Sequence, residues 1–251
     1  MTEPLIQLQG ITKVYGQGAA GFRALDGVDL TVERGDFIAV MGASGSGKST
    51  LLKIMAGIDK DIEGEAIPMP NLKIGYLPQE ASVFRKLSVE DNIISVLEMT
   101  KLSKVARKEK ADSLIQEFRL QHVRKNMGDT LSGGERRRTE IARALAVDPK
   151  FILLDEPFAG VDPIAVEDIQ EIIAKLKYRN IGILITDHNV NETLSICDRA
   201  YLLIDGSIFR EGTAEELAQD DHVRRLYLGR NFQLRRKDYL HDAALRSSQN
   251  P

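Results

Sequence analysis

The chain is poor in cysteine, tryptophan and long apolar runs. Its 251 residues contain one cysteine, Cys197, so no disulfide can form within the chain. Apolar runs such as 181–185 are far shorter than the roughly 20 residues that a membrane-spanning helix needs. The start, MTEPLIQLQG, lacks the basic and apolar regions of a secretion signal. We therefore expect a cytoplasmic chain that does not cross a membrane by itself.

An excess of one charge is also absent. The chain has 34 basic and 37 acidic residues, for a formal net charge of -3. Binding to a polyanion usually shows as a basic excess, so the composition gives no reason to expect nucleic acid as a partner. What is present is a hydrophobic content of 43%, which is ample for a buried core.

Short β-type runs alternate with helical patterns along much of the chain. In order, they are 37–41 with a helix after Lys48, 151–154 with a helix from Asp162, and 181–186 with a helix over 189–197. This alternation predicts an α/β fold with a mostly parallel sheet flanked by helices. Near the end of the chain, 201–204 and 208–210 flank an Asp-Gly pair, which predicts a β-hairpin.

The stretch 88–147 differs because it is almost wholly helical in pattern. A capping box at Ser88 and Asp91 opens it, and an apolar stripe follows at 114–118. We interpret 88–147 as a helical subdomain inserted into a single domain whose core is 1–87 and 148–234. The remainder, 235–251, is polar and is expected to be a loose tail.

Residues 42–49 read GASGSGKS, which fits the phosphate-loop pattern G-x-x-x-x-G-K-[ST] between a strand and a helix. Glycines let backbone N–H groups turn toward phosphate oxygens, and the helix N-terminus adds positive potential. Lys48 would neutralise the β- and γ-phosphates, and the Ser49 hydroxyl would bind Mg²⁺. The alternative is a glycine-rich helix entry without a ligand. The predicted nucleotide-binding residues are Gly42, Ala43, Ser44, Gly45, Ser46, Gly47, Lys48, Ser49 and Thr50.

The run FILLDE at 151–156 places two acids at the carboxyl end of a predicted strand, where open α/β sheets bind ligands. Asp155 would hold Mg²⁺, and Glu156 would act as general base toward the attacking water. The alternative is a pair of solvated acids at a strand end. Together with the phosphate loop, the run indicates a nucleotide hydrolase.

The sequence LSGGE at 131–135 resembles the signature of the ABC ATPase family. Ser132 and Glu135 also form a capping box, which is the purely structural interpretation, although such a helix start is itself a suitable anion site. The resemblance implies ATP hydrolysis and a homodimer that forms head to tail with ATP. In this family, a second subunit's phosphate loop is closed by the residues that correspond to Ser132, Gly133, Gly134 and Glu135.

Other positions fit the same family in order. Gln79 matches the Q-loop glutamine that senses Mg²⁺, and His188 matches the histidine that contacts the γ-phosphate. Asp162 matches an aspartate at the dimer interface, and it is also placed to cap a helix before Pro163. Tyr15 matches the aromatic residue that stacks on adenine; its alternative is an ordinary edge-strand tyrosine.

Different parts of the chain resemble different branches of the family. Residues 74–234 resemble the ATPase of the lipopolysaccharide export system, 1–50 resemble macrolide and lipoprotein exporters, and 51–80 resemble ABC-F translation factors. We therefore interpret the chain as a possible engineered chimera with packing errors at boundaries near Thr50 and Ile74. The short segment 49–78 predicts a trimmed β-hairpin region.

The resemblance implies a peripheral subunit on the cytoplasmic face of the inner membrane. Integral membrane subunits would dock in the groove beside Gln79, through Phe84 and Arg85. Lipopolysaccharide export is the first hypothesis for the transport process. A macrolide or lipoprotein exporter, a ribosome-binding factor and an inactive chimera remain the alternatives.

Overall fold

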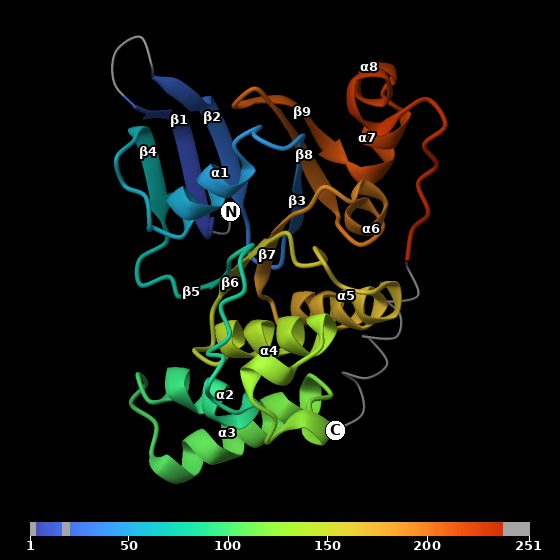
Figure 1. Cartoon of the computed structure of the whole chain (residues 1–251). Helices are drawn as coiled ribbons and strands as arrows, with labels where there is room; N and C mark the ends of the chain where they lie inside the picture. The colour runs from blue at the N-terminus through green and yellow to red at the C-terminus, as the bar shows by residue number, and fades with distance from the viewer. Residues whose placement is uncertain (1–3, 17–20, 238–251) are drawn as a thin grey trace.

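The computed structural model describes residues 4–16 and 21–237. It contains a six-stranded sheet in the order β5-β6-β7-β3-β8-β9 and a three-stranded antiparallel sheet in the order β2-β1-β4 (Figure 1). In the larger sheet all neighbours are parallel except β8 and β9, so the predicted fold class is confirmed. The strands are β1 (Ile6–Tyr15), β2 (Phe22–Val32), β3 (Phe37–Met41), β4 (Glu63–Pro68), β5 (Ile74–Leu77), β6 (Phe151–Asp155), β7 (Gly182–Thr186), β8 (Arg199–Ile204) and β9 (Ser207–Thr213).

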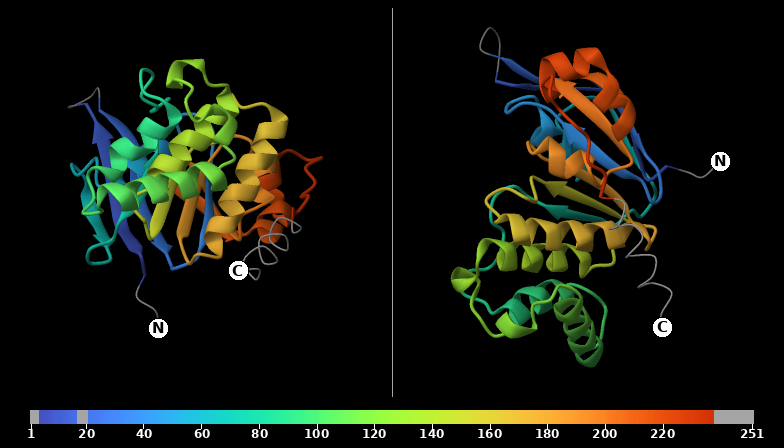
Figure 2. Two further views of the ribbon diagram at one scale, coloured as in Figure 1. Left: turned by 90° about the horizontal axis from the view of Figure 1, so that it is seen from below. Right: turned by 90° about the vertical axis from the view of Figure 1, so that its right-hand side faces the viewer.

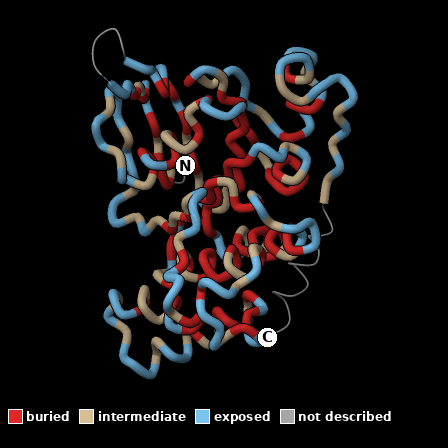
Figure 3. Tube along the Cα trace, viewed as in Figure 1, coloured by how far each residue is buried: buried red, intermediate tan, exposed pale blue. Residues whose placement is uncertain are grey.

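Helices lie on both sides of the large sheet. Figure 2 shows α5 against one face, with α4 next and α2 and α3 at the far end of the molecule, whereas α1 lies between the two sheets. Figure 3 shows that buried residues concentrate along the central strands. The helices are α1 (Lys48–Met55), α2 (Val89–Leu97), α3 (Lys104–Glu117), α4 (Gly133–Leu145), α5 (Pro163–Lys177), α6 (Val190–Leu194), α7 (Ala214–Gln219) and α8 (Asp221–Val223).

Several local predictions match the structure. The β8–β9 hairpin turns at Asp205 and Gly206, both with positive φ, and Asp162 accepts from the Ala165 N–H to cap α5. The helices α2, α3 and α4 all fall within 88–147. The helix expected over 189–197 is shorter and ends at Leu194, because the chain must turn there to enter β8. Among the described residues, no helix has both the length and the apolar character to span a bilayer.

The segment between α1 and β5 contributes one strand, β4, to the antiparallel sheet. No packing fault is seen at the boundary expected near Thr50, since Leu51 and Leu52 are fully buried. A hollow of about 540 Å³ does lie between α1 and the antiparallel sheet, lined in part by Ile54 and Ile74. Ile54 is only 3% exposed, so the hollow does not uncover this face of α1.

The expected loose tail does not begin at Arg235. Arg236 donates to the carbonyls of Leu194 and Cys197 at 3.0 and 2.6 Å, and the Lys237 N–H donates to the Ser195 carbonyl at 3.0 Å. These bonds fix the segment across the end of α6. The rest of that tail, 238–251, lies outside the described residues.

Candidate nucleotide-binding site

Four parallel strands end at one edge of the large sheet and carry the predicted site residues there. The phosphate loop follows β3, Asp155 ends β6, His188 follows β7 and Gln79 follows β5. These strands are neighbours in the sheet, so residues separated by more than 100 positions lie close together (Figure 1). Carboxyl ends of such strands are where ligands bind in open α/β sheets.

The phosphate loop has a backbone that only glycine can adopt at Gly47. Its φ of 104° is left-handed, and a Cβ there would lie 2.4 Å from the Ala24 carbonyl oxygen. The next residue, Lys48, begins α1, so the helix N-terminus faces the loop. The buried Ser46 hydroxyl has no hydrogen-bond partner among the described residues. The loop therefore combines a helix N-terminus with one unpaired hydroxyl, both of which suit an anion.

Lys48 is buried against this loop. Its ammonium donates to the carbonyls of Gly42 and Ala43 at 2.7 and 2.9 Å. Burial lowers the pKa of Lys48, and the nearby carboxylates of Glu156 and Asp155 oppose that shift. The side chain is thus held at the loop that is expected to bind phosphate.

A residue that the sequence did not single out holds the start of the loop. The Gly42 N–H donates to the Tyr227 hydroxyl at 3.1 Å, and that hydroxyl donates to the Gly42 carbonyl at 3.3 Å. Burial raises the pKa of Tyr227, which keeps the hydroxyl protonated as a donor. The two residues are 185 positions apart, so no local pattern indicates the contact.

Asp155 and Ser49 place side-chain oxygens next to each other. The buried Asp155 carboxylate accepts from the Ser49 hydroxyl at 3.2 Å and from the Thr186 hydroxyl at 2.7 Å. Carboxylate and hydroxyl oxygens suit Mg²⁺, which usually keeps several waters and phosphate oxygens as its other ligands. Within the described part of the chain, no three histidine, cysteine or acidic side chains cluster as a metal site. A Mg²⁺ site here would therefore draw on few side chains.

Glu156 lies between two other predicted site residues, Gln79 and His188. Its carboxylate accepts from Gln79 Nε2 at 2.9 Å and lies 3.5 Å from His188 Nδ1. The backbone has a φ of 47°, which is uncommon for a residue other than glycine. Its N–H donates to the Thr186 carbonyl at 2.9 Å, which helps to hold this conformation. The structure thus brings Gln79, Glu156 and His188 together.

Arg137 of α4 binds the backbone of Asp155 and Glu156 at the end of β6. The buried guanidinium donates to the carbonyls of Asp155 at 2.9 Å and Glu156 at 2.7 Å, and to Pro78 beside Gln79 at 3.0 Å. Its partner Glu140, at 3.2 Å, accepts from the N–H groups of Ser82 and Val83. One helix therefore positions both the acidic residues and the segment after Gln79.

Tyr15 and Phe22 stand at the other end of the site. They are paired across β1 and β2, and both are exposed. Phe22 was not expected from the sequence; its place opposite Tyr15 depends on strand register. A pocket of about 280 Å³ is lined by Tyr15, Phe22, Ala24, Ser44, Gly45, Gly47, Lys48, Ser49, Thr50, Gln79 and Glu156.

The signature residues and Asp162 do not line this pocket. Ser132 and Glu135 form the expected capping box at the start of α4, and His122 Nε2 lies 3.0 Å from Glu135. A Cβ at Gly134 would lie 2.6 Å from the Ala165 side chain, so the close packing of α4 against α5 requires a glycine here. Within one chain, these residues are separate from the phosphate loop.

The residues expected to meet a membrane subunit lie at the surface. Phe84 and Arg85 are both exposed, and the Arg143 guanidinium lies 4.4 Å from the Phe84 ring centroid. The Phe84 N–H donates to the Asn92 side chain at 2.8 Å, which fixes the backbone. The backbone that carries the exposed ring is therefore anchored to α2.

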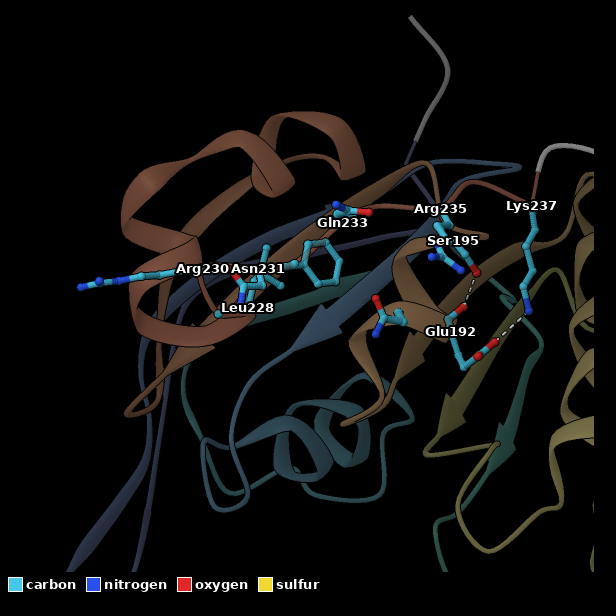
Figure 4. Close-up of a pocket in the computed structure, with 11 residues that line it drawn as sticks. Glu192, Ser195, Leu228, Arg230, Asn231, Gln233, Arg235 and Lys237 are labelled. Atoms are coloured by element: carbon cyan, nitrogen blue, oxygen red, sulfur yellow. Dashed lines mark hydrogen bonds and ion pairs between the residues drawn. The ribbon is translucent and has the colours of Figure 1, made fainter.

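A separate pocket of about 740 Å³ lies between α6 and the C-terminal segment (Figure 4). Lys237 reaches Glu192 at 2.9 Å, and the Ser195 hydroxyl donates to the Glu192 carbonyl at 2.8 Å. Figure 4 shows Arg230 directed away from these groups. The Lys237 contact ties the segment to the helix that follows His188.

Comparisons with known proteins identify the family of the chain. The family model described as ABC transporter matches residues 25–159. The lipopolysaccharide export system ATP-binding proteins LptB of Haemophilus influenzae and Escherichia coli are 51% and 49% identical to this chain. They cover 84% and 85% of it, and the alignments span 93% and 94% of those proteins. The chain belongs to the ABC transporter ATP-binding family.

Solved structures of the family have the same fold. A dimeric ATP-binding cassette, MJ0796, bound to ADP and Pi has a TM-score of 0.76 and 30% identity, covering 83% of this chain and 98% of that one. MJ1267, another cassette, has a TM-score of 0.79 and 29% identity, covering 91% and 100%. The chain is thus an ATP-binding, ATP-hydrolysing cassette of an ABC transporter.

The chimera interpretation receives no support. The LptB of Acidithiobacillus ferridurans is 46% identical over 242 residues, covering 92% of this chain and 99% of its own length. So broad a match extends across both proposed boundaries. A single relative therefore accounts for segments that seemed to resemble three branches.

Proposed function

We propose that this chain hydrolyses ATP to power the export of lipopolysaccharide from the inner membrane. The observation that carries the proposal is the near-50% identity to lipopolysaccharide export ATPases over almost their whole length. The convergence of Gln79, Glu156 and His188 supports the hydrolytic part.

In the proposed site, Tyr15 stacks on adenine and the phosphate loop holds the phosphates. Ser49, Gln79 and Asp155 would hold Mg²⁺, which supplies charge neutralisation on the phosphates when it is bound. Lys48 donates to the β- and γ-phosphates.

Glu156 accepts a proton from the attacking water as that oxygen bonds to the γ-phosphorus, and the bond from phosphorus to the ADP oxygen breaks. Gln79 orients the Glu156 carboxylate through its 2.9 Å hydrogen bond. His188, 3.5 Å from Glu156, lies where it could donate to the γ-phosphate. Arg137 keeps the backbone of both acids in place.

The site is completed by a second copy of the chain, with Ser132, Gly133, Gly134, Glu135 and Asp162 at the interface. A two-fold dimer makes every contact twice, so two phosphate loops would each meet a partner's signature. The 88–147 helices carry this signature and would move with the membrane subunits. These subunits would dock at Phe84 and Arg85 beside the Gln79 segment, on the cytoplasmic face of the membrane.

Reconstitution tests the transport assignment. The purified chain is mixed with the membrane subunits of a lipopolysaccharide exporter, or with a macrolide exporter's membrane subunit, in detergent. We expect a stable complex and stimulated ATP hydrolysis with the first set only. Association with the macrolide exporter instead would overturn the assignment and leave the ATPase intact.

Phe84→Ala should weaken that complex while leaving the isolated ATPase active. Phe209→Ala is the matched control, because Phe209 is also exposed and also lies beside an arginine, Arg210. Equal loss of association in both variants would remove Phe84 from the interface.

A further inference from the structure

Tyr15 is held in one orientation by groups outside the phosphate loop. Its hydroxyl donates a 3.1 Å hydrogen bond to Asp59 Oδ2. The Lys13 ammonium lies 5.0 Å from the centroid of the Tyr15 ring. The residue is still 41% exposed and lines the nucleotide pocket. The ring is thus anchored at its polar end while it remains accessible for stacking.

Asp59 is itself fixed by a buried cation. Lys13, only 4% exposed, binds Asp59 Oδ1 at 2.9 Å and the Asp61 carbonyl at 2.6 Å. The hydrogen bond from Lys13 is the main reason that the pKa of Asp59 is lowered. The carboxylate therefore stays ionised at neutral pH and accepts from both Lys13 and Tyr15.

The anchor is attached to the same helix as the phosphate loop. The Asp59 N–H donates at 3.2 Å to the carbonyl of Lys53, in the last turn of α1. Lys48 and Ser49 lie in the first turn of this helix. A helix of eight residues is about 12 Å long and rigid. Consequently α1 sets the separation between the phosphate loop and the residue that tethers Tyr15.

We infer that Asp59 is a positioning residue for the nucleotide base: with Lys13, it holds the Tyr15 ring at a fixed distance from the phosphate loop so that adenine stacks without ordering a mobile side chain. This inference rests on the proposed adenine contact at Tyr15. Fixing an aromatic side chain in advance removes part of the entropic cost of binding. Asp59 touches no nucleotide atom in this scheme and acts through Tyr15.

The test measures binding of a fluorescent ATP analogue to Tyr15→Ala, Tyr15→Phe, Asp59→Ala and the double variant that combines Tyr15→Phe with Asp59→Ala. Tyr15→Phe keeps the ring and removes only the tethering hydroxyl. Each single variant should raise Kd about three- to tenfold, and the double variant should raise it no further, because the two groups act as one unit. The loss should appear in KM for ATP rather than in kcat. Inhibition by tripolyphosphate, which has no base, should not change.

Asp61→Ala is the matched control. Asp61 lies in the same segment, carries the same charge and binds Lys13 at 3.3 Å, but its side chain is 99% exposed. Its carboxylate accepts from Lys13, whereas the Tyr15 hydroxyl donates to Asp59. The Kd of this variant should equal that of the parent.

The outcomes separate this inference from the proposed adenine contact. If Tyr15→Ala weakens binding but Tyr15→Phe and Asp59→Ala do not, stacking stands and the positioning role is overturned. If Tyr15→Ala has no effect, the adenine contact itself fails. Additive losses, or weaker tripolyphosphate inhibition, would also overturn the positioning role. Should Asp59→Ala fail to fold, Tyr15→Phe decides, because it removes no charge.

Discussion

Gln79 Nε2 donates a 2.9 Å hydrogen bond to Glu156 Oε2, so the end of β5 holds the carboxylate that follows β6. The segment after Gln79 is in turn bonded to Glu140 of α4 and carries Phe84 at the surface. A displacement at the surface would therefore reach the Glu156 carboxylate through few contacts. Under the proposed function, this arrangement would couple hydrolysis to a membrane subunit.

Replacing Gln79 should affect turnover more than binding. In Gln79→Ala the Glu156 carboxylate loses its fixed orientation, and we expect kcat to fall about 10- to 100-fold with little change in KM. Steady-state phosphate release measures both constants. Glu80→Ala is the control, since Glu80 is exposed and does not line the pocket. A large rise in KM with unchanged kcat would contradict the orienting role.

The bond between Tyr227 and Gly42 should stabilise the fold. In Tyr227→Phe the buried Gly42 N–H loses its acceptor, which typically costs about 1–3 kcal/mol. Urea unfolding measures the free energy. Tyr76→Phe should be nearly neutral, because the Tyr76 hydroxyl has no hydrogen-bond partner in the part of the chain described. Equal stability of both variants would show that Tyr227 is replaceable.

Glu90 should make stability depend on pH. Hydrogen bonds from Arg124 and then Lys125 lower its pKa to about 2, below its ordinary value of 4.5. A carboxyl with a lowered folded pKa stabilises the protein above its unfolded pKa, and this contribution is lost as pH falls from about 4.5 toward 2. Glu90→Gln should thus lower the free energy of unfolding at pH 7 by about 2 kcal/mol.

The difference between parent and Glu90→Gln should shrink in urea unfolding at pH 4 and again at pH 3. Glu109→Gln, at an exposed position of α3, is the control and should match the parent at each pH. A difference that stays constant with pH would show that ionisation of Glu90 does not contribute.

Mixing two inactive variants tests the shared site. Lys48→Ala and Ser132→Arg should each abolish hydrolysis in a homodimer. In a mixed dimer, one of the two sites combines the intact Lys48 of the Ser132→Arg subunit with the intact Ser132 of the Lys48→Ala subunit. The other site carries both substitutions and stays inactive. Random pairing makes about half of the dimers mixed, so about a quarter of the parental activity should return. No recovery, with mixed dimers present by size and tag, would contradict a site shared between subunits.

The sequence points directly to the candidate-site residues that are continuous in the chain. The phosphate loop, Asp155 and Glu156 each belong to short patterns whose chemistry depends on neighbouring residues. The mostly parallel sheet followed from the alternation of strands and helices, which predicts that strand ends such as those before Gln79 and His188 meet at one edge.

Residues that act across the fold could not be predicted in this way. In the sequence, Arg137 is one of three consecutive arginines at 136–138, and nothing distinguishes it from the other two. Only the packing of α4 shows that it binds the carbonyls of Asp155 and Glu156. Tyr227 and Asp59 similarly depend on contacts with Gly42 and Tyr15, far away in the chain. The chimera interpretation gave short stretches of similarity more weight than the whole-length relationship supports.

Phosphate release from purified parent and Glu156→Gln with Mg-ATP, with particle size followed in parallel, tests the hydrolytic site most directly. The parent should turn over. The variant should lose about 100- to 10,000-fold in rate and form a dimer only when ATP is present, because binding is intact and the general base is gone. Glu109→Gln should behave as the parent. Turnover of Glu156→Gln near the parental rate, or an inactive parent, would contradict the assigned catalytic site.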